Sequence, residues 1–327
     1  MVSKQNNSLY RSVNETSERL LRRPRSNVAP LREDISVSFE FFPPNTEQAG
    51  VNLWQSIERL APLQPKFVSV TYGAGGTTRE RTHATVKRIV DETTLIPAAH
   101  LTCVSASCDE VDEIVDSYWQ AGVRHIVALR GDPPDGGENF TPHPQGYRNA
   151  SDLVDGIKRR HDFKISVAAF PEVHPEALSA QADLDNLKRK IDAGATTAIT
   201  QFFFEPESFL RFRDHAIQAG INVPIIPGIL PVTNFTRVKD FAARCGARVP
   251  DWLSGLFEGL DDAPDIRQLV AATVTAELCT RLVDHGVNDF HFYTLNRSEL
   301  TMAFCHILGI RPTPGAGIDQ VTNASEA

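Results

Sequence analysis

The chain has 327 residues, of which 41% are hydrophobic and 23% are charged, a composition typical of a globular protein. Its 41 acidic and 33 basic residues give a net charge of -8, which lends no electrostatic support to a nucleic-acid partner. No apolar run approaches the ~20 residues of a membrane-spanning helix, so no membrane partner is expected. Five cysteines without CxxC spacing, and no signal peptide, favour reduced thiols and a cytoplasmic protein.

The two ends of the chain differ from its middle. Residues 1–34 contain an arginine-rich run without a hydrophobic periodicity that could pack. We expect a disordered N-terminal extension there; the alternative is a targeting peptide. Residues 313–327 are small and polar and are expected to form a flexible C-terminal tail. Residues 35–312 are therefore predicted to form a single folded domain.

The first predicted strand covers residues 36–42 and ends at two prolines, which cannot donate to a sheet ladder. Side chains alternate along a strand, so Glu40 shares its face with Ser38. Phe39 and Phe41 take the opposite face. Burial on so apolar a strand disfavours the ionised carboxylate, which makes Glu40 a candidate general acid. The alternative is a strand-end glutamate that reaches solvent or pairs with an arginine.

The rest of the chain repeats one pattern, in which a helix is followed by a glycine and a β-rich strand. The clearest glycines, each in the place of a left-handed helix cap, are Gly122, Gly194, Gly220 and Gly286. The eight predicted strands lie near residues 36–42, 66–72, 97–102, 125–129, 165–170, 197–203, 223–228 and 288–293. Eight such units predict an α/β fold, the TIM (β/α)8 barrel, with extra helices between strands 7 and 8. A doubly wound open sheet is the alternative, but Thr78 replaces the third glycine of its GxGxxG fingerprint.

Two helix starts carry capping signals. Ser107 with Glu110 forms the pattern of a capping box ahead of a helical apolar stripe. Asn296 with Glu299 is predicted to open the last helix in the same way.

Polar residues gather where the predicted strands end, which is where a barrel has its active site. They include Glu40, Thr71, Tyr72, His100, Arg130, Asp132, His174, Gln201 and Tyr293. No HExxH or paired-cysteine spacing supports a metal, and no GxSxG elbow supports a serine hydrolase. The sequence Arg130-Gly131-Asp132 offers a cation, a close backbone approach and an anion, which suits a large heteroaromatic cofactor.

One helix carries a polar stripe. Asp183, Asn186 and Lys190 recur at helical spacing after the fifth strand. Such a stripe is either a solvated face or the lining of a site for a ligand's sugar and phosphates.

Eight segments, in order along the chain, carry a resemblance to a known family. They are SFEFFPP (38–44), PKFVSVTYGAGG (65–76), HLTC (100–103), HIVALRGDPP (125–134), PEVHPEA (171–177), ITQFFF (199–204), IIPGILPV (225–232) and FHFYTLNR (290–297). From about residue 36 to 312 the chain resembles the methylenetetrahydrofolate reductases of the bacterial type.

The resemblance implies a function as well as a fold. It implies an FAD enzyme that reduces 5,10-methylenetetrahydrofolate to 5-methyltetrahydrofolate with NADH or NADPH, by a ping-pong mechanism, and so supplies methyl groups for methionine synthesis. It further implies a homo-oligomer, and a chain without the S-adenosylmethionine-responsive domain of the eukaryotic enzymes.

The resemblance also implies roles for single residues. Glu40 matches the acid that protonates the folate and opens its five-membered ring, and Asp132 matches the aspartate beside flavin and pterin. Gln201 matches the amide that recognises the pterin. The positions that match FAD contacts are Thr71, Tyr72, Ala74, His100, Arg130, Gly131, Asp132, Phe170, His174, Ala177, Asp183, Asn186, Arg189 and Lys190. The positions that match contacts to folate or nicotinamide are Gln201, Arg237, Phe241, Tyr293 and Arg297.

Two of these positions depart from the family pattern. Phe170 stands where relatives have a tyrosine beside the flavin, so one hydrogen bond worth about 1 kcal/mol is missing. Arg237 replaces a glutamine, and the added cation could favour a polyglutamate tail or a phosphorylated nicotinamide.

Two other functions compete with this interpretation. The first is a TIM-barrel flavoprotein with a different substrate, such as a proline-dehydrogenase-like enzyme; the match of Glu40, Gln201 and Arg297 argues against it. The second is a barrel kept as a non-enzymatic binding subunit. That function predicts loss of the acid or of the flavin contacts, whereas both sets of residues are present.

Overall fold

The computed structural model describes residues 35–73, 79–133 and 140–313. The predicted extension over residues 1–34, the cofactor position Ala74 and residues 314–327 of the predicted tail lie outside these ranges. Thr313, the first residue of that predicted tail, is described, and its N–H donates to Pro62 O at 2.7 Å. Across the described ranges, no helix combines the length and the apolar character needed to cross a membrane.

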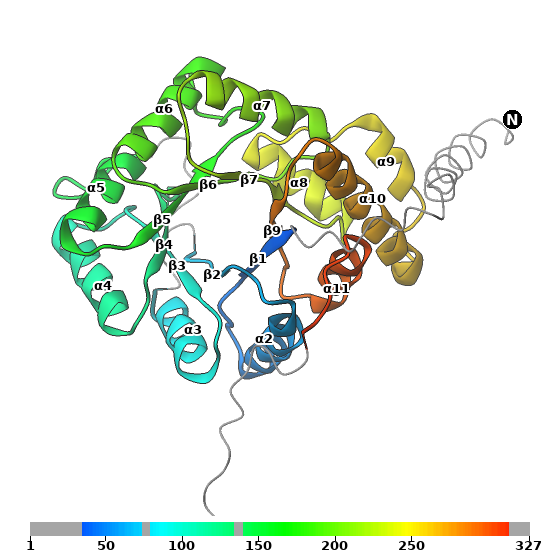
Figure 1. The fold of residues 1–327 in the computed structure, drawn as a ribbon, viewed down its shortest axis with the longest axis horizontal. Helices are drawn as coiled ribbons and strands as arrows, with labels where there is room; N and C mark the ends of the chain where they lie inside the picture. The colour runs from blue at the N-terminus through cyan, green and yellow to red at the C-terminus, as the bar shows by residue number, and fades with distance from the viewer. Residues whose placement is uncertain (1–34, 74–78, 134–139, 314–327) are drawn as a thin grey trace, which may run out of the picture.

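Nine parallel strands form one sheet that curves into a nearly closed barrel, with helices around its outside (Figure 1). In spatial order the strands run β7-β6-β5-β4-β3-β2-β1-β9-β8. Their bounds are β1 Ser36–Phe41, β2 Val68–Val70, β3 Pro97–Thr102, β4 His125–Leu129, β5 Lys164–Ala169, β6 Thr197–Thr200, β7 Ile225–Ile226, β8 Gly228–Ile229 and β9 Asp289–Tyr293. The predicted α/β barrel is confirmed.

The strand predicted over residues 223–228 consists of two short pieces, one on each side of Pro227. β7 pairs with β6, whereas β8 pairs with β9. Proline has no N–H for a ladder, but the carbonyl of Pro227 still accepts from His291 N at 3.0 Å. Gly228 N then donates to the side chain of Thr200 at 2.9 Å. The chain therefore passes from one neighbouring strand to the other at Pro227, and the barrel closes there.

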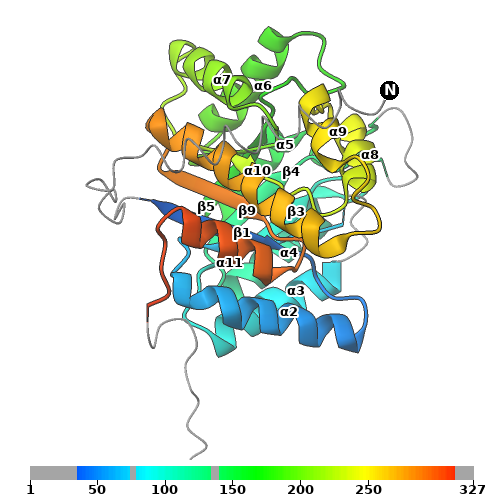
Figure 2. The same ribbon diagram turned by 90° about the vertical axis from the view of Figure 1, so that its right-hand side faces the viewer.

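Helices follow the strands and cover the outside of the barrel (Figures 1 and 2). They are α2 Glu47–Leu60, α3 Arg79–Glu92, α4 Cys108–Gln120, α5 Ala150–Arg160, α6 Ala180–Asp192, α7 Pro206–Gln218, α8 Phe235–Cys245, α9 Asp251–Phe257, α10 Pro264–Asp284 and α11 Ser298–Ile307, with the 3-10 helix η2 at Ala61–Leu63. The extra helices predicted before the last strand are α8, α9 and α10, and this prediction is confirmed.

Most of the helix caps predicted from the sequence form in the structure, and one does not. The capping box at Ser107 and Glu110 forms at the start of α4 with both of its hydrogen bonds. The four glycines expected to end helices all have positive φ, from 79° to 116°. The capping prediction for Asn296 is wrong, because α11 begins at Ser298 after an Arg297 cap. The side chain of Asn296 bonds the backbone N and O of Phe42 instead, at 2.9 and 3.0 Å, and so ties the end of β1 to the end of β9.

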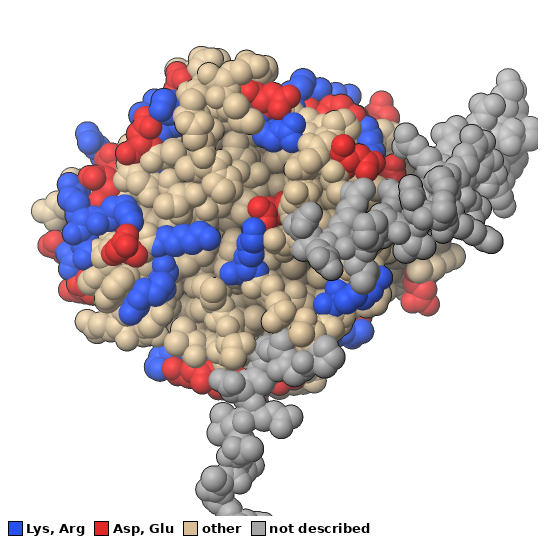
Figure 3. Space-filling model, viewed as in Figure 1, with Lys and Arg blue, Asp and Glu red and all other residues tan. Residues whose placement is uncertain are grey.

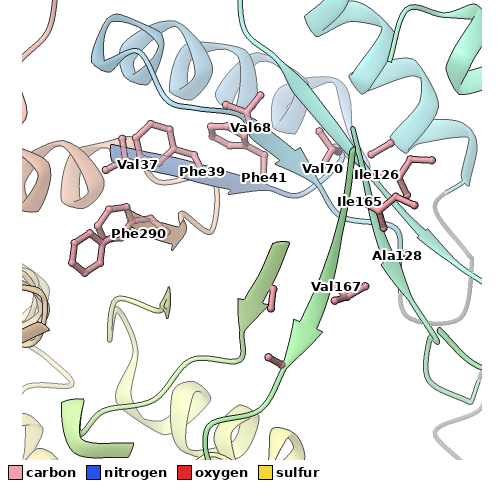
Figure 4. Close-up of a cluster of buried hydrophobic side chains, with 14 of the residues drawn as sticks. Val37, Phe39, Phe41, Val68, Val70, Ile126, Ala128, Ile165, Val167 and Phe290 are labelled. Atoms are coloured by element: carbon pink, nitrogen blue, oxygen red, sulfur yellow. The ribbon is translucent and has the colours of Figure 1, made fainter. Parts of the chain in front are cut away.

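The main apolar core lies between the strands and the helices. Phe39 and Phe41 of β1 lie beside Val68 and Val70 of β2, and all four are at most 1% exposed (Figure 4). Ile57 of α2 belongs to the same cluster. The predicted alternation along the first strand is confirmed, since these phenylalanines face the helices and their neighbour Glu40 lines a cavity on the other side.

The inside of the barrel carries polar side chains where branched apolar residues are common in this fold. Ser38 Oγ lies 2.8 Å from His291 Nδ1, and His125 Nε2 lies 2.8 Å from Ser166 Oγ. All four residues are at most 1% exposed. The ring of Phe67 lies between the two histidines, edge-on to His125 at 4.7 Å and stacked on His291 at 5.6 Å. The barrel therefore holds a buried polar column beneath its mouth.

Candidate active site

A cavity of about 760 Å³ is lined by the C-terminal ends of the barrel strands and by helix α6. That volume suits a ligand of cofactor size. The predicted site residues that line it are Glu40, Thr71, Tyr72, His100, Arg130, Gly131, Asp132, Phe170, His174, Ala177, Asp183, Asn186, Arg189, Lys190, Gln201, Phe241 and Tyr293. On the face drawn in Figure 3, Lys and Arg side chains gather near the middle of the view among residues that are mostly uncharged.

Three predicted site residues are not among those that line the cavity. Arg237 on α8 and Arg297 ahead of α11 are both exposed and are not part of the lining. Ala74 lies outside the described residues. The ligand contacts of these three residues stay predictions.

Glu40 is held at the end of β1 between two imidazoles. Its Oε2 atom lies 3.4 Å from His100 Nε2 on β3 and 3.8 Å from His291 Nε2 on β9, and its side chain is 12% exposed. Burial lowers the pKa of His100 to about 4, and the charge of Glu40 acts in the opposite direction without overcoming it. His100 is therefore neutral near pH 7, and the acid faces two imidazoles instead of the arginine considered from the sequence.

Tyr293 neighbours Glu40 across the β1–β9 pair. Its hydroxyl donates to Thr200 O at 2.7 Å. Burial holds the pKa of Tyr293 well above its usual value, and the nearby carboxylate of Glu40 adds to that shift. The tyrosine therefore stays protonated, and it links the wall of the cavity to the point where the barrel closes.

The polar stripe of α6 faces the cavity. Ser179 caps this helix by accepting from Ala182 N at 3.1 Å. Asp183 accepts from His174 N at 2.9 Å, and Lys190 Nζ donates to Ala168 O at 2.5 Å. Burial lowers the pKa of Lys190 to about 8, although the carboxylate of Asp183 acts against the shift. Since Asp183 and Lys190 are 9% and 5% exposed, the stripe is not a solvated face.

Arg130 makes a two-pronged ion pair that the sequence reasoning missed. Its two terminal nitrogens lie 2.6 and 2.9 Å from the carboxylate of Glu176, which also lines the cavity. The guanidinium carbon of Arg130 lies 4.6 Å from the ring centroid of Phe140. Gly131 has φ 87°, a conformation that favours glycine and brings the backbone to the cavity wall. Glu176 belongs to the PEVHPEA segment, so the signal for it was present in the sequence.

An amide and two aromatic rings form the opposite wall of the cavity. Gln201 Oε1 accepts from Phe202 N at 3.0 Å, which fixes the orientation of the amide. Phe202 stacks on Phe241 with centroids 5.3 Å apart. Phe241 is 40% exposed on α8, so its other face is open to a flat ligand ring.

The loop after β5 is fixed by Glu172, a second residue whose role the sequence reasoning missed. One carboxylate oxygen accepts from Ser208 Oγ at 3.0 Å and the other from Arg248 N at 2.8 Å. The next residue, Val173, has φ 72°, which is strained for a β-branched side chain. The two bonds to neighbouring segments hold the loop in this conformation, and the loop in turn positions His174.

The cavity wall also contains a cysteine. Cys245 lines the cavity, and burial raises the pKa of its thiol to about 11, so it is a neutral thiol near pH 7. All five cysteines are free. Within the described ranges, no group of three His, Cys, Asp or Glu side chains has the arrangement needed to hold a metal ion.

Comparison with known proteins places the chain in a family. The family model "Methylenetetrahydrofolate reductase" matches residues 25–309. The chain belongs to the methylenetetrahydrofolate reductase family. The 5,10-methylenetetrahydrofolate reductase of Escherichia coli (strain K12) is 56% identical over 286 residues, which cover 88% of this chain and 95% of that protein. The Arabidopsis thaliana protein "Methylenetetrahydrofolate reductase (NADH) 1" is 34% identical over 84% of this chain and 48% of its own length.

One solved structure adds to the comparison of folds. It is titled "Uncharacterized protein from Clostridium thermocellum binds two copies of 5-methyl-5,6,7,8-tetrahydrofolic acid". Its TM-score is 0.58, with 18% identity over 85% of this chain and 95% of that one, a likeness that concerns the fold alone.

The family assignment confirms the resemblance to the bacterial-type reductases. The chain is thus an oxidoreductase with the function of methylenetetrahydrofolate reductase. Neither a proline-dehydrogenase-like enzyme nor a non-enzymatic barrel fits this assignment.

Proposed function

We propose that the chain reduces 5,10-methylenetetrahydrofolate to 5-methyltetrahydrofolate in a ping-pong reaction, with NADH or NADPH as the electron donor and FAD as the cofactor. The observation that carries the proposal is the position of Glu40, a largely buried acid at the end of β1, in the same cavity as the polar stripe of α6. We further propose a cytoplasmic homo-oligomer that supplies methyl groups for methionine synthesis. The five free cysteines agree with a reducing compartment, and the oligomer rests on the family resemblance.

The residues of the cavity fit FAD. Lys190, Arg189 and Arg130 supply cations for its phosphates, and Asp183 and Asn186 supply polar groups for its sugar portions. The volume of about 760 Å³ accommodates a ligand of that size. When bound, FAD would supply hydride transfer between nicotinamide and folate.

The protein's own residues would bind, orient and protonate the substrate. Glu40 would donate one proton to a ring nitrogen of the folate, and this opens the five-membered ring to a cation that accepts hydride. Asp132 would stabilise that positive charge from the cavity wall. Gln201 would recognise the pterin with its oriented amide, and Phe241 would stack on a flat ring.

A first experiment tests cofactor and donor together. The purified protein is examined anaerobically by visible absorbance, before and after addition of NADH and, separately, NADPH. We expect a flavin spectrum that bleaches with at least one donor. A protein that is colourless and cannot take up added FAD would contradict the proposed cofactor.

A second experiment tests the acid. We expect Glu40→Gln to slow the folate half-reaction by roughly 100- to 10,000-fold, because the amide cannot supply a carboxylic proton. Flavin reduction by nicotinamide should remain within about threefold of the parent protein. Stopped-flow absorbance measures both half-reactions. Glu299→Gln makes the same chemical change at an exposed position that pairs with Arg59, and serves as the control. Equal loss of both half-reactions would reject the role of Glu40.

A further inference from the structure

The buried polar column beneath the cavity reaches the proposed acid, because His291 Nε2 lies 3.8 Å from Glu40 Oε2. β1 and β9 run in parallel with Ser38 opposite His291, one step before Glu40 opposite Tyr293. His291 is 1% exposed and lines the base of the cavity. His291 belongs to the FHFYTLNR segment (290–297), but the sequence alone assigned it no function.

The imidazole of His291 is fixed on three sides. Its Nδ1 atom lies 2.8 Å from Ser38 Oγ, and its ring stacks on Phe67 and meets Tyr293 edge-on at 5.4 Å. These contacts leave Nε2 pointing at Glu40 Oε2, 3.8 Å away. The ring therefore cannot turn away from the carboxyl group without breaking buried contacts.

The surroundings of Ser38 select one tautomer of His291. The serine hydroxyl has a single proton, and it lies 3.3 Å from Phe290 O, a carbonyl that can only accept. When the hydroxyl donates to Phe290 O, its oxygen accepts a hydrogen bond from the N–H that His291 carries at Nδ1. Nε2 then bears a lone pair directed at Glu40, because a neutral imidazole has one donor and one acceptor nitrogen.

His100 presents a second nitrogen to the same carboxyl oxygen. His100 Nε2 lies 3.4 Å from Glu40 Oε2 and is buried, yet it makes no hydrogen bond within the described part of the chain. An unpartnered buried polar atom is costly. If Glu40 carries a proton on Oε2, it can donate a hydrogen bond to one of these two nitrogens. If Glu40 is ionised, its carboxylate is repelled by a lone pair on either nitrogen.

We propose that His291, held by Ser38 in the tautomer with its proton on Nδ1, is a positioning residue that favours the protonated form of Glu40 and holds its carboxyl group at the base of the cavity. The proposal rests on the proposed role of Glu40 as the acid. In this role His291 accepts a hydrogen bond and gives up no proton; Glu40 transfers its own proton to the folate nitrogen and regains one from solvent.

The other titratable groups around this pair do not change charge near neutral pH. They are His100 on β3, His125 on β4 and Tyr293 on β9. Burial lowers the pKa of His100 to about 4 and that of His125 to about 3. Burial keeps the pKa of Tyr293 well above its usual value. These three groups therefore do not interfere with a pH profile measured between about pH 6 and pH 9.

The tautomer can be tested without cofactor or turnover. Protein labelled with nitrogen-15 in its histidine rings is examined by NMR at neutral pH, and the signals of His291 are assigned by their loss in His291→Asn. We expect a protonated-type signal for Nδ1 and an unprotonated-type signal for Nε2. The reverse assignment would overturn the proposal.

The effect on the acid is tested with the two half-reactions. In His291→Asn the alkaline fall-off of the folate half-reaction should move to lower pH by about one unit, which lowers the rate on that limb about tenfold. Flavin reduction by nicotinamide should keep its pH profile. Ser38→Ala should move the fall-off in the same direction by a smaller amount, and His291→Gln, whose amide reaches the position of Nε2, should restore part of it. These two variants keep the test decisive if His291→Asn does not fold.

His125→Asn is the matched control. His125 is an equally buried histidine bonded to a serine of the barrel interior, but it is not part of the cavity lining. Its replacement should leave the fall-off in place, whatever it costs in stability. An unchanged fall-off in both His291→Asn and Ser38→Ala, with a functional parent protein, would refute the proposal. A parent protein that performs neither half-reaction would refute the proposed function instead.

Discussion

Lys190 lines the proposed ligand site, and its burial there lowers the stability of the folded protein. Its amine is 5% exposed, donates to Ala168 O, and has a pKa lowered by burial to about 8. At neutral pH the folded protein therefore holds a cation with few partners, which destabilises the fold by about 3 kcal/mol relative to an exposed lysine. Such a cost is tolerated where the charge serves a bound anion.

We expect Lys190→Met to stabilise the cofactor-free protein by about 2 kcal/mol at pH 7, because about 1 kcal/mol is lost with the hydrogen bond to Ala168. The pKa of Lys190 is about 8 in the folded chain against the ordinary 10.5, so between these values the unfolded chain binds more protons. The parent protein therefore gains stability as pH rises through this window, and the advantage of the variant disappears. Urea unfolding at both ends of the window measures the difference.

Lys188→Met is the control for this prediction. Lys188 lies on the same helix, is 43% exposed and pairs with Asp192 at 2.9 Å. Its replacement should change stability little, with no pH dependence of this kind. A stabilisation by Lys190→Met that stays constant as pH rises would contradict the assigned cause.

At the scale of elements, the decisive feature is the closure of the barrel between β6 and β9. The two short strands β7 and β8 each pair with one neighbour, and Gly228 lies where the chain changes sides. A Cβ atom on Gly228 would come within 2.1 Å of Thr200 O and 2.6 Å of the Tyr293 hydroxyl. The closure therefore needs glycine for space, and it positions Tyr293 beside Glu40.

We expect Gly228→Ala to lower the free energy of unfolding by about 3 kcal/mol, because the added methyl group displaces backbone or Tyr293. The folate half-reaction should fall more than flavin reduction by nicotinamide, since Tyr293 neighbours the acid. Urea unfolding and stopped-flow absorbance measure the two effects. Gly255→Ala in α9 is the control: nothing lies within 4 Å of its added Cβ, and it should stabilise the helix by about 0.5–1 kcal/mol. Equal behaviour of the two variants would contradict the argument.

At the scale of the whole molecule, one cavity collects side chains from strands far apart in the sequence and from α6. A ligand that fills this cavity contacts both halves of the barrel, so its binding and the folding of the barrel are coupled. Helix α8, the first of the extra helices, adds Phe241 and Cys245 to the same cavity, which makes this part of the insertion a part of the site.

We expect added FAD at about 100 times its Kd to raise the free energy of unfolding by about 2.7 kcal/mol. For a domain of this size the midpoint of thermal unfolding should rise by roughly 5–10 °C. Lys190→Met should show a smaller rise at the same FAD concentration, because a cation for the phosphates is gone. If FAD saturates the flavin spectrum but leaves the midpoint of thermal unfolding unchanged, FAD binding does not stabilise the fold. That outcome would contradict the proposed site.

Much of this structure could be predicted from local patterns. The alternation around Glu40, the glycines that end helices and the capping box at Ser107 depend on neighbours within a few residues. They were correct for that reason. The prediction for Asn296 failed because its side chain found a partner in Phe42, 254 residues away. The split at Pro227 was likewise invisible, since it depends on which strands the chain meets on each side.

Local sequence patterns are sufficient to predict the barrel, the order of its elements, the polar stripe of α6 and the family of the chain. The partners of the site residues, in contrast, follow from contacts that form on folding. Glu176 beside Arg130, Glu172 between two segments, and His291 beneath Glu40 each depend on contacts between distant parts of the chain. Periodicity reports which face a side chain takes, but the charge state and orientation of a buried group depend on atoms that only folding brings within a few ångströms.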